Sequence, residues 1–384
     1  MQAVILAAGE GRRVRPLTWS RPKAMIPVAN RPIIAYTIDA LVTNGIRDII
    51  VVVGYRKEHV TRLLNQLDLP IEVVIQEKQL GTAHALQQAE SQIKGDFLLL
   101  PGDNYIDAQS VAKIKEIKNA VLVKEHPNPS NFGVITVRDG RVDSIVEKPD
   151  HATSFLVSTG IYSLPTDFFQ YVRGNDVTEA ISCMIENGID VHAVTADDWQ
   201  DAIYPWDLIR LNQRLLRHMP ATREGTSSRH ATIQGPTHIG KGTTIGPNTV
   251  ISGPVIIGND CTIGPNCCIL PNTSIGSRVT IEPLSLIGNT ILMDDTSIAS
   301  HSRIMDSVIG ERCVLADHIS TGTTEGFLEI EGKPTHSHFG AILGDNVTCG
   351  SFARFRNGIV GNNATLEGNR VVSSRIIPDD TMVI

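Results

Sequence analysis

Residues 237–258, THIGKGTTIGPNTVISGPVIIG, repeat the same arrangement every six residues. Isoleucine recurs at this spacing ten times without a miss, from Ile233 to Ile287, and glycine stands just after it in most units. A helix has a period near 3.6 and a strand a period of 2, so neither accounts for a period of six. A coil of three short parallel strands does, because each unit then forms one side of a triangular prism filled by stacked isoleucines. Residues 229–384 are therefore predicted to form a β-helix.

This repeat resembles the hexapeptide-repeat family, and the resemblance implies a left-handed parallel β-helix. The register slips at Ile298 and Ile309, and residues 319–338 are expected to form a protruding loop before the coil resumes. Such a prism leaves flat faces and an open end, which this family covers by trimerising. We therefore expect a homotrimer or a higher multiple built on the β-helix.

The residues before the repeat have a different rhythm. Up to about residue 217, apolar strand-like runs alternate with helical patterns, as in IRDIIVVVG followed by RKEHVTRLLNQL. This order predicts a mostly parallel, Rossmann-like α/β sheet with helices on both faces and ligands at the carboxyl ends of its strands. Asp139-Gly140 between two alternating runs predicts an inserted hairpin. The polar, aperiodic residues 220–228 indicate a linker between domains 1–219 and 229–384.

Composition excludes several classes of protein. The chain has 384 residues, of which 41% are hydrophobic and 20% charged, as expected for a globular protein of two domains. A net charge of −7 argues against a general nucleic-acid binder. No apolar run reaches the roughly 18 residues of a membrane span, and Met1 leads directly into the first apolar strand. We expect a cytoplasmic protein with neither membrane nor nucleic-acid partners.

The cysteines are expected to fill the core. The six cysteines show no Cys-x-x-Cys spacing, and five of them stand in the repeat at positions otherwise held by threonine or small apolar residues. This placement favours structural filler over a metal site or a disulfide.

Residues 6–25, LAAGEGRRVRPLTWSRPKAM, place two glycines, four arginines and a lysine directly after an apolar strand. Neither the dinucleotide fingerprint nor the Walker loop fits, because Val14 stands at the third glycine position and no Gly-Lys-Ser/Thr follows. The loop still offers backbone amides and cations, which together suit a polyphosphate. Lys23 lies between Pro22 and an apolar run with no acidic neighbour, so a local ion pair does not explain it.

Residues 1–215 resemble the sugar-1-phosphate nucleotidylyltransferases. LAAGEGRRVRPLT followed by Arg21-Pro22-Lys23 follows their signature, with Arg12 as the one departure from the usual Thr or Ser. Further motifs follow in the order of that family: Gln76 with Leu80–Ala83, Gly102-Asp103, Phe132–Val134, Glu147–Pro149, Gly160–Tyr162 and Trp199–Asp201. The resemblance implies transfer of a nucleoside monophosphate from a nucleoside triphosphate to a sugar-1-phosphate, with release of pyrophosphate.

The same resemblance assigns roles to individual residues. Arg13 is assigned to the β- and γ-phosphates and Lys23 to the α-phosphate. The nucleotide-binding residues implied are Leu6, Ala7, Ala8, Gly9, Gly11, Gln76, Gly81 and Thr82. The sugar-phosphate-binding residues implied are Gly133, Glu147, Lys148, Ser158 and Gly160.

A magnesium site is expected at Asp103. This carboxylate ends the very apolar strand DFLLLPGD, where burial is costly unless a cation pairs with it. A helix N-cap is the alternative role for Asp103. The family pattern places Asp201 as the second ligand and leaves Asp207 to cap the following helix, although the choice between these two stays open.

Base and sugar identity stay open. The side-chain amide of Gln76 can pair with uracil or thymine, which differ by one methyl group, so UTP and dTTP are both candidates. Ser158 stands where the family often has an asparagine that contacts the sugar. Glucose-1-phosphate and N-acetylglucosamine-1-phosphate therefore both remain candidate acceptors.

The repeat domain raises the question of a second activity. The domain order is similar to that of archaeal bifunctional uridylyltransferase/acetyltransferases, whose acetyl-transfer site has a basic His, a Tyr and an Asn. Here His301 is one place out of register, Arg303 replaces the Tyr, and residues 321–327 lack the Asn. A shift of one residue turns a side chain to the other face of a strand. Three hypotheses remain: a nucleotidylyltransferase, a bifunctional enzyme that also acetylates an amino sugar, and a non-catalytic regulatory relative.

Overall fold

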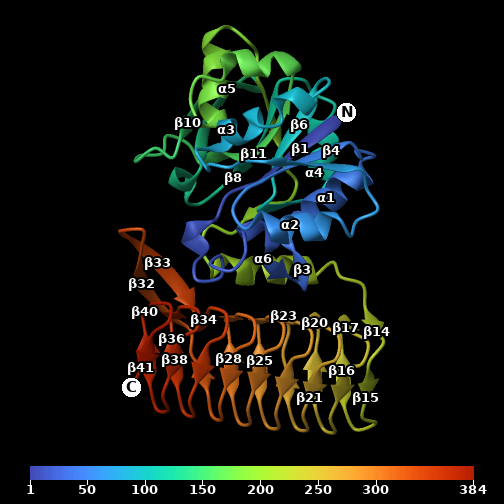
Figure 1. Ribbon diagram of the computed structural model, residues 1–384, viewed down its shortest axis with the longest axis vertical. Helices are drawn as coiled ribbons and strands as arrows, with labels where there is room; N and C mark the ends of the chain where they lie inside the picture. The colour runs from blue at the N-terminus through green and yellow to red at the C-terminus, as the bar shows by residue number, and fades with distance from the viewer. The chain divides into compact units, whose positions relative to one another are not determined.

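The computed structural model describes residues 1–384 and divides into two compact units. The first unit comprises residues 1–10, 21–25 and 33–201. The second comprises residues 11–20, 26–32 and 202–384 (Figure 1). No helix in either has the length and apolar character needed to cross a membrane.

A mixed sheet of nine strands forms the centre of the first unit, with the strand order β5-β4-β1-β6-β11-β8-β12-β10-β9. Its strands are β1 (Gln2–Ala7), β4 (Ile49–Val53), β5 (Ile71–Ile75), β6 (Phe97–Pro101), β8 (Ala120–Glu125), β9 (Gly133–Arg138), β10 (Arg141–Glu147), β11 (Leu156–Leu164) and β12 (His192–Thr195). Strands β5, β4, β1 and β6 are parallel, and β11 runs antiparallel to β6 and β8. The expected Rossmann-like α/β fold is confirmed.

The inner parallel strands β4 and β6 are almost fully buried, and this explains their continuous apolar sequences, whereas the edge strand β5 is partly exposed. All five residues of β4 and four of the five residues of β6 are buried. The helices of this unit are α1 (Ile33–Thr43), α2 (Lys57–Leu64), α3 (Thr82–Gln87), α4 (Ala108–Ile114) and α5 (Val177–Glu186). On α5, Val177, Ala180, Ile181 and Met184 pack into the same core as the sheet.

The predicted hairpin is present as β9 and β10, which are joined at Asp139 and Gly140. Both of these residues have positive φ, 52° and 78°, as a tight hairpin turn requires. A second antiparallel pair is formed by β7 (Asn104–Ile106) and β13 (Trp199–Asp201). This pair brings two distant segments together at the end of β6.

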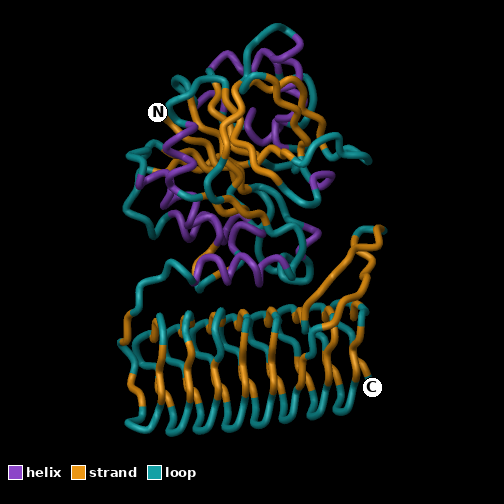
Figure 2. The backbone as a smooth tube through the Cα atoms, turned by 180° about the vertical axis from the view of Figure 1, so that it is seen from behind, coloured by secondary structure: helices purple, strands orange, loops and turns teal.

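Three parallel sheets form the β-helix of the second unit (Figure 2). One contains β14 (Thr222–Arg223), β17 (Thr237–Ile239), β20 (Val255–Ile257), β23 (Thr273–Ile275), β26 (Ile291–Leu292), β29 (Val308–Ile309), β34 (Ala341–Leu343), β37 (Gly358–Val360) and β40 (Ile376–Ile377). Another contains β15 (Thr226–Ser227), β18 (Thr244–Ile245), β21 (Thr262–Ile263), β24 (Thr280–Ile281), β27 (Ser297–Ile298), β30 (Val314–Leu315), β35 (Thr348–Cys349), β38 (Thr365–Leu366) and β41 (Met382–Val383). The third contains β16 (Thr232–Gln234), β19 (Val250–Ser252), β22 (Cys268–Ile269), β25 (Leu286–Gly288), β28 (Arg303–Met305), β31 (Ser320–Thr321), β36 (Arg354–Arg356) and β39 (Val371–Ser373).

The interior stack follows the predicted period. Ile257 pairs with Ile275 across one coil of 18 residues, whereas Ile275 pairs with Leu292 across 17. Later coils without the inserted hairpin are also 17 residues long, as between Leu292 and Ile309 and between Leu343 and Val360, so each register slip in the sequence is one residue lost at the corresponding corner of a coil. The predicted left-handed β-helix is confirmed. Asparagines at corner positions such as Asn248 and Asn266 adopt positive φ, which asparagine tolerates well.

Four of the five cysteines of the coil fill its interior, and none forms a disulfide. Cys261, Cys267, Cys313 and Cys349 are buried and all six cysteines are free. Burial raises the pKa of each of these four thiols, and that of Cys313 to about 12.

The stretch expected to be a protruding loop is a β-hairpin. Strands β32 (Thr324–Ile330) and β33 (Lys333–Phe339) pair along their whole length and project from the β-helix (Figure 1). Glu331 and Gly332 form the turn with φ of 49° and 77°, the conformation that two-residue hairpins favour. His336 and His338, expected on a loop, therefore lie on strand β33.

The second unit takes up the chain from Ala202, so it already includes the expected linker of residues 220–228. Thr222 and Thr226 in the expected linker pair with His238 and Thr244, so they already belong to the first coil. Helix α6 (Asp207–Leu216) also belongs to this unit, because the Asn212 amide donates to the Asn272 carbonyl at 3.0 Å. The short pair β2 (Pro27–Val28) and β3 (Arg31–Pro32) joins α6 there.

Candidate active site

A lysine and two carboxylates meet in the first unit. Lys23 lies on a short 3-10 turn, Asp103 follows strand β6, and Asp201 ends strand β13. Because β13 pairs with β7, Asp201 lies opposite Asn104, the neighbour of Asp103. The Lys23 Nζ lies 2.5 Å from Asp201 Oδ1 and 3.3 Å from Asp103 Oδ2. Three segments far apart in the sequence thus converge on one ammonium group.

The electrostatics of this cluster are those of a nearly buried ion pair. Only 7% of the Lys23 side chain is exposed, against 40% for Asp103 and 21% for Asp201. Burial alone lowers the pKa of Lys23, but the attraction of Asp103 and Asp201 outweighs it and holds that pKa above its ordinary value. Lys23 is therefore charged at neutral pH.

The two carboxylates fit a magnesium ion that shares its remaining ligands with phosphate. Mg²⁺ commonly binds one or two carboxylates together with substrate phosphates and water. A cluster of three or more metal-ligating side chains is absent, so protein side chains alone do not complete a site. Asp107, not Asp103, caps α4. Asp207 is the first residue of α6 and, instead of capping it, accepts a hydrogen bond from the Tyr204 amide at 2.9 Å.

Gln76 lies in a hydrogen-bonded corner after strand β5. Its side chain is buried, and its Nε2 donates to the Gly81 carbonyl at 3.2 Å and to His84 Nδ1 at 2.8 Å. The carbonyl oxygen Oε1 is left to accept a hydrogen bond. Gly81 has φ of 147°, and a Cβ there would lie 2.4 Å from the Asn175 carbonyl oxygen, so only glycine fits.

The chain passes from buried to open surroundings just after strand β1. Leu6 accepts a hydrogen bond from the Gly102 amide, and Ala7 and Ala8 are buried beside it. At Gly9 an added Cβ would meet no atom within 4 Å, so the chain faces open space there. Thr82 begins α3, and its Oγ1 accepts from the Val177 amide at 3.0 Å.

Residues expected to bind the sugar phosphate gather on β9, β10 and β11. The Lys148 ammonium pairs with Glu147 Oε1 at 2.8 Å, and this lysine has a positive φ of 41°. Gly133 lies against the same glutamate, because a Cβ there would be 3.3 Å from Oε2. The Ser158 hydroxyl lies 2.8 Å from that of Tyr162 and accepts from the Gly160 amide at 3.1 Å.

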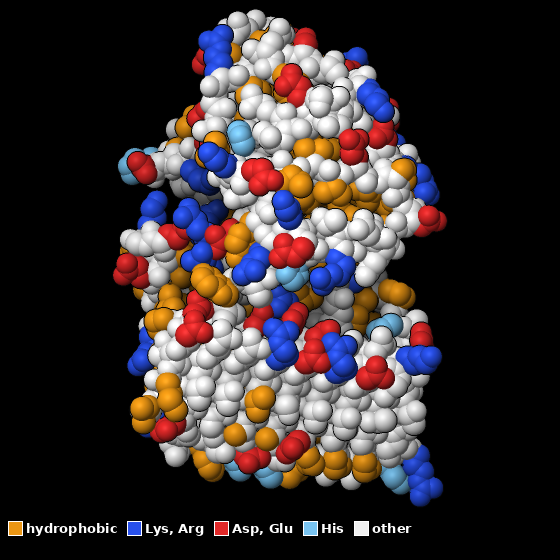
Figure 3. Space-filling model, in the orientation of Figure 1, with side chains coloured by type: hydrophobic (Ala, Val, Ile, Leu, Met, Phe, Trp, Pro, Cys, Tyr) orange, Lys and Arg blue, Asp and Glu red, His pale blue; other side chains and the backbone are white.

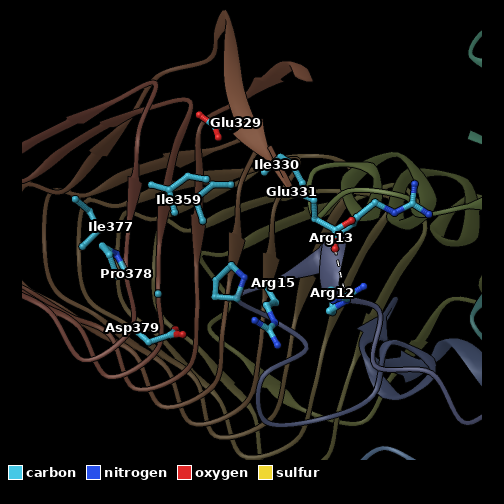
Figure 4. A pocket seen from close by; sticks show the side chains of 13 residues that line it. Arg12, Arg13, Arg15, Glu329, Ile330, Glu331, Ile359, Ile377, Pro378 and Asp379 are labelled. Carbon is cyan, nitrogen blue, oxygen red and sulfur yellow. Dashed lines mark ion pairs between the residues drawn. The ribbon is translucent and has the colours of Figure 1, made fainter. Parts of the chain in front are cut away.

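Arg13 and Gly11 belong to the second unit, on the loop of residues 11–20. This loop and the last coils of the β-helix line a pocket of about 330 Å³, which Figure 4 shows. The pocket is lined by Arg12, Arg13, Arg15, Pro16, Glu329, Ile330, Glu331, Ile359, Gly361, Ile376, Ile377, Pro378 and Asp379. Arg12 pairs with Glu331 at the tip of the hairpin at 3.6 Å, and both side chains are exposed.

Sequence reasoning missed two sets of residues. The first is His84, which orients the Gln76 amide and stands only two residues after Thr82 in the motif. The second is the set of β-helix side chains that hold the arginine loop, among them Asp345 and Asn362. A signal existed for the second set, because residues 345, 362 and 379 recur at a spacing of 17, the coil length of this region.

The residues considered for a second activity lie on the β-helix surface. His301 is exposed at a corner with φ of 58° and stacks on His318, with ring centroids 4.9 Å apart. Arg303 donates from its guanidinium to the Thr321 carbonyl at 2.7 Å. No hydrogen bond joins His301 to a carboxylate or carbonyl that would orient it as a base.

Both parts of the chain are similar to known protein families. The nucleotidyl transferase family model matches residues 2–217, and the GMPPB C-terminal domain model matches residues 251–325. The bifunctional protein GlmU of Methanococcus maripaludis is 39% identical over 397 residues, covering 98% of this chain and 95% of that protein. The UTP–glucose-1-phosphate uridylyltransferase AglF of Haloferax volcanii is 37% identical over 234 residues, or 56% of this chain and 96% of that protein. A glucose-1-phosphate thymidylyltransferase of Bacillus anthracis, solved with sucrose, has a TM-score of 0.52 at 26% identity and covers 58% of this chain and 98% of that one.

Proposed function

Because this chain belongs to the nucleotidyl transferase family, we propose that it transfers a nucleoside monophosphate from UTP or dTTP to a sugar-1-phosphate and releases pyrophosphate. The observation that carries this proposal is the convergence of Lys23, Asp103 and Asp201 at the end of β6. A buried, charged lysine beside two carboxylates suits a reaction between two phosphate anions. A purely regulatory protein has no need of such a costly arrangement.

In this reaction the protein must position the two substrates and screen their negative charges. A phosphate oxygen of the sugar attacks the α-phosphorus in line, the bond between that phosphorus and the bridging oxygen breaks, and pyrophosphate leaves with the electron pair. The nucleophile is already ionised, so catalysis rests on holding and screening the two anions. We assign Lys23 to the α-phosphate and Arg13 to the β- and γ-phosphates. Mg²⁺ held by Asp103 and Asp201 would neutralise charge on the phosphate oxygens.

We propose that the base of the nucleotide is a pyrimidine, because of the hydrogen bonds of Gln76. Its Nε2 is already used by Gly81 and His84, so Oε1 is the atom that would accept the N3–H of uracil or thymine. The AglF relative is named for UTP and glucose-1-phosphate, and the Bacillus anthracis protein is named for thymidylyl transfer to glucose-1-phosphate. Glucose-1-phosphate and N-acetylglucosamine-1-phosphate are the acceptors we propose, bound by Lys148, Glu147 and the Ser158 region.

The proposal is tested by pyrophosphate release from a matrix of the four common nucleoside triphosphates and these two sugar-1-phosphates. We expect turnover with UTP or dTTP and loss of activity in Lys23→Met. Lys113→Met is the matched control, because Lys113 makes an ion pair of the same 2.5 Å length with Asp197 in an exposed place. Absence of turnover in the whole matrix, or equal activity of the two variants, contradicts the proposal.

A second activity deserves a test because the relatives that span this chain are bifunctional GlmU proteins. We propose that this chain does not acetylate amino sugars efficiently. His301 stacks on another histidine instead of meeting an orienting acceptor, and Arg303 occupies the expected tyrosine position. The assay is thiol release from acetyl-CoA with glucosamine-1-phosphate. Robust release that disappears in His301→Ala would overturn this proposal.

We also propose that the protein is a homotrimer, or a higher multiple, assembled through the β-helix. One broad face of the β-helix carries few charged side chains, with hydrophobic and histidine side chains along its lower edge (Figure 3). Val250 and Val371 are 38% and 57% exposed on outward positions of one sheet. Light scattering of the full chain tests this, and a monomer at micromolar concentration contradicts it.

A further inference from the structure

The loop that carries Arg13 is attached to the β-helix by two buried side chains. Asn362 Nδ2 donates to the Pro16 carbonyl at 3.1 Å, and the Ser20 hydroxyl donates to Asp345 Oδ2 at 2.5 Å. Asn362 and Asp345 are each only 2% exposed. All four residues belong to the second unit.

These two side chains also serve the β-helix itself. Asp345 Oδ1 accepts from the Glu311 amide at 2.8 Å, and Asn362 Oδ1 accepts from the Asp345 amide at 2.8 Å. Asn259 has the same task in an earlier coil, where its Oδ1 accepts from the Lys241 amide at 2.9 Å. One oxygen therefore satisfies a backbone donor of the neighbouring coil in each case.

The second polar atom of each side chain is what distinguishes the last coils. Asp345 Oδ2 accepts from the Ser20 hydroxyl, and Asn362 Nδ2 donates both to the Pro16 carbonyl and, at 2.8 Å, to Asp379 Oδ1 of the next coil. No such contact to the loop exists at Asn259. A carboxyl group is costly to bury, and the coil-to-coil bond satisfies only one oxygen of Asp345. The loop contact gives that carboxylate a further donor.

Hydrogen bonds within the loop connect these anchors to the arginine. The Gly11 carbonyl accepts from the Val14 amide at 2.9 Å and from the Thr18 hydroxyl at 3.1 Å. Hydrogen bonds within the loop therefore fix the segment around Arg13. The contacts of Pro16 and Ser20 attach that segment to the β-helix. The exposed pair of Arg12 with Glu331 adds little, because solvent screens the attraction between exposed charges.

We propose that Asp345 and Asn362 are positioning residues that set the place of Arg13 for the pyrophosphate part of the nucleotide. This inference rests on the proposed function of Arg13. The last coils of the β-helix then take part in nucleotidyl transfer without touching substrate. The hydrogen bonds restrict the loop before the nucleotide arrives, so less ordering is needed on binding.

The first test reads the loop without any substrate. Trp19 lies in this loop and is 43% exposed, whereas Trp199 and Trp206 are each 5% exposed. Quenching of tryptophan fluorescence by acrylamide therefore reports on Trp19. We expect stronger quenching in Ser20→Ala and Asn362→Ala than in wild type, and wild-type quenching in Asn259→Ala. Unchanged quenching in the loop variants overturns the proposal whatever their activity.

The second test is kinetic. Ser20→Ala and Asn362→Ala are expected to raise the KM for the triphosphate, and for pyrophosphate in the reverse reaction, about three- to tenfold, as the loss of one hydrogen bond implies. In an Arg13→Ala background the same changes should have almost no further effect, because the positioned group is gone. Asp345→Asn, which keeps an oxygen for the coil and a polar group for Ser20, should be closer to wild type than Asp345→Ala.

Two results overturn the inference while leaving the proposed function intact. The first is an equal KM change in Asn259→Ala, which would show a general effect of the coil ladder. The second is full additivity with Arg13→Ala. Failure of the proposed function is recognised separately, because wild type would then release no pyrophosphate from any substrate pair.

Discussion

Replacement of Lys23 by methionine tests the carboxylate cluster most directly, because it removes the charge and keeps a side chain of similar length. The Nζ is 2.5 Å from Asp201 and 3.3 Å from Asp103, and only 7% of the side chain is exposed. The variant leaves two neighbouring carboxylates without their cation. We therefore expect loss of folding stability as well as loss of transfer.

The size of the stability change follows from burial. Two unit charges about 3 Å apart attract by roughly 5 kcal/mol at an effective dielectric constant of about 20, and desolvation opposes this attraction. Removal of one partner of a buried pair costs about 3–5 kcal/mol. Because 40% of the Asp103 side chain is exposed and solvent screens it, we expect the lower limit, about 3 kcal/mol. For a unit of this size, that lowers the melting temperature by about 6–12 °C.

The direction in which the pKa of Lys23 is shifted determines how its contribution to folding stability changes with pH. A raised pKa in the folded state means that the contribution of Lys23 is complete below its unfolded value of 10.5 and is lost as pH rises through the folded value. The difference between wild type and Lys23→Met should therefore persist throughout the neutral range.

Thermal unfolding monitored by circular dichroism measures this, with Lys113→Met as the control. The exposed pair of Lys113 with Asp197 predicts a change of about 0–1 kcal/mol. Added Mg²⁺ should stabilise Lys23→Met more than wild type, because the metal then replaces the missing cation between the carboxylates. Equal melting of the two variants, or a magnesium effect that is the same in both, would refute the reasoning.

Three further results are expected. Arg13→Ala should slow pyrophosphate release about a hundredfold or more, with an unchanged thermal transition, because it removes a cation that acts on the departing phosphates; near-native turnover would contradict its role. EDTA should abolish turnover, and Asp103→Asn should raise the magnesium requirement more than Asp207→Asn, whose carboxylate caps the Tyr204 amide; the reverse ranking in a magnesium titration would reassign the metal ligands. Tyr162→Phe should lower the free energy of unfolding in urea by about 1 kcal/mol, because the buried Ser158 hydroxyl loses one partner; an unchanged midpoint would show that this bond contributes nothing.

The sequence by itself determined the features that local periodicity encodes. The six-residue spacing predicted the isoleucine stack, and the slip at Ile298 turned out to be a corner shortened by one residue. The alternation of apolar runs and helical patterns predicted the α/β unit and its hairpin at Asp139 and Gly140. The hairpin at Glu331 and Gly332 was missed, because its signal is a short alternation inside a region where the six-residue period fails.

The tertiary structure decided which distant residues meet. Lys23 has no acidic neighbour in the sequence, and its partners Asp103 and Asp201 arrive through the pairing of β7 with β13. The limits of the units were decided in the same way, because contacts to the coils draw α6 and residues 11–20 into the second unit. Side-chain contacts between segments hundreds of residues apart have no period and no fixed spacing. They depend on where the folded backbone places each segment, so the spacing of 17 could point to Asp345 and Asn362, but only the structure shows that they hold the Arg13 loop.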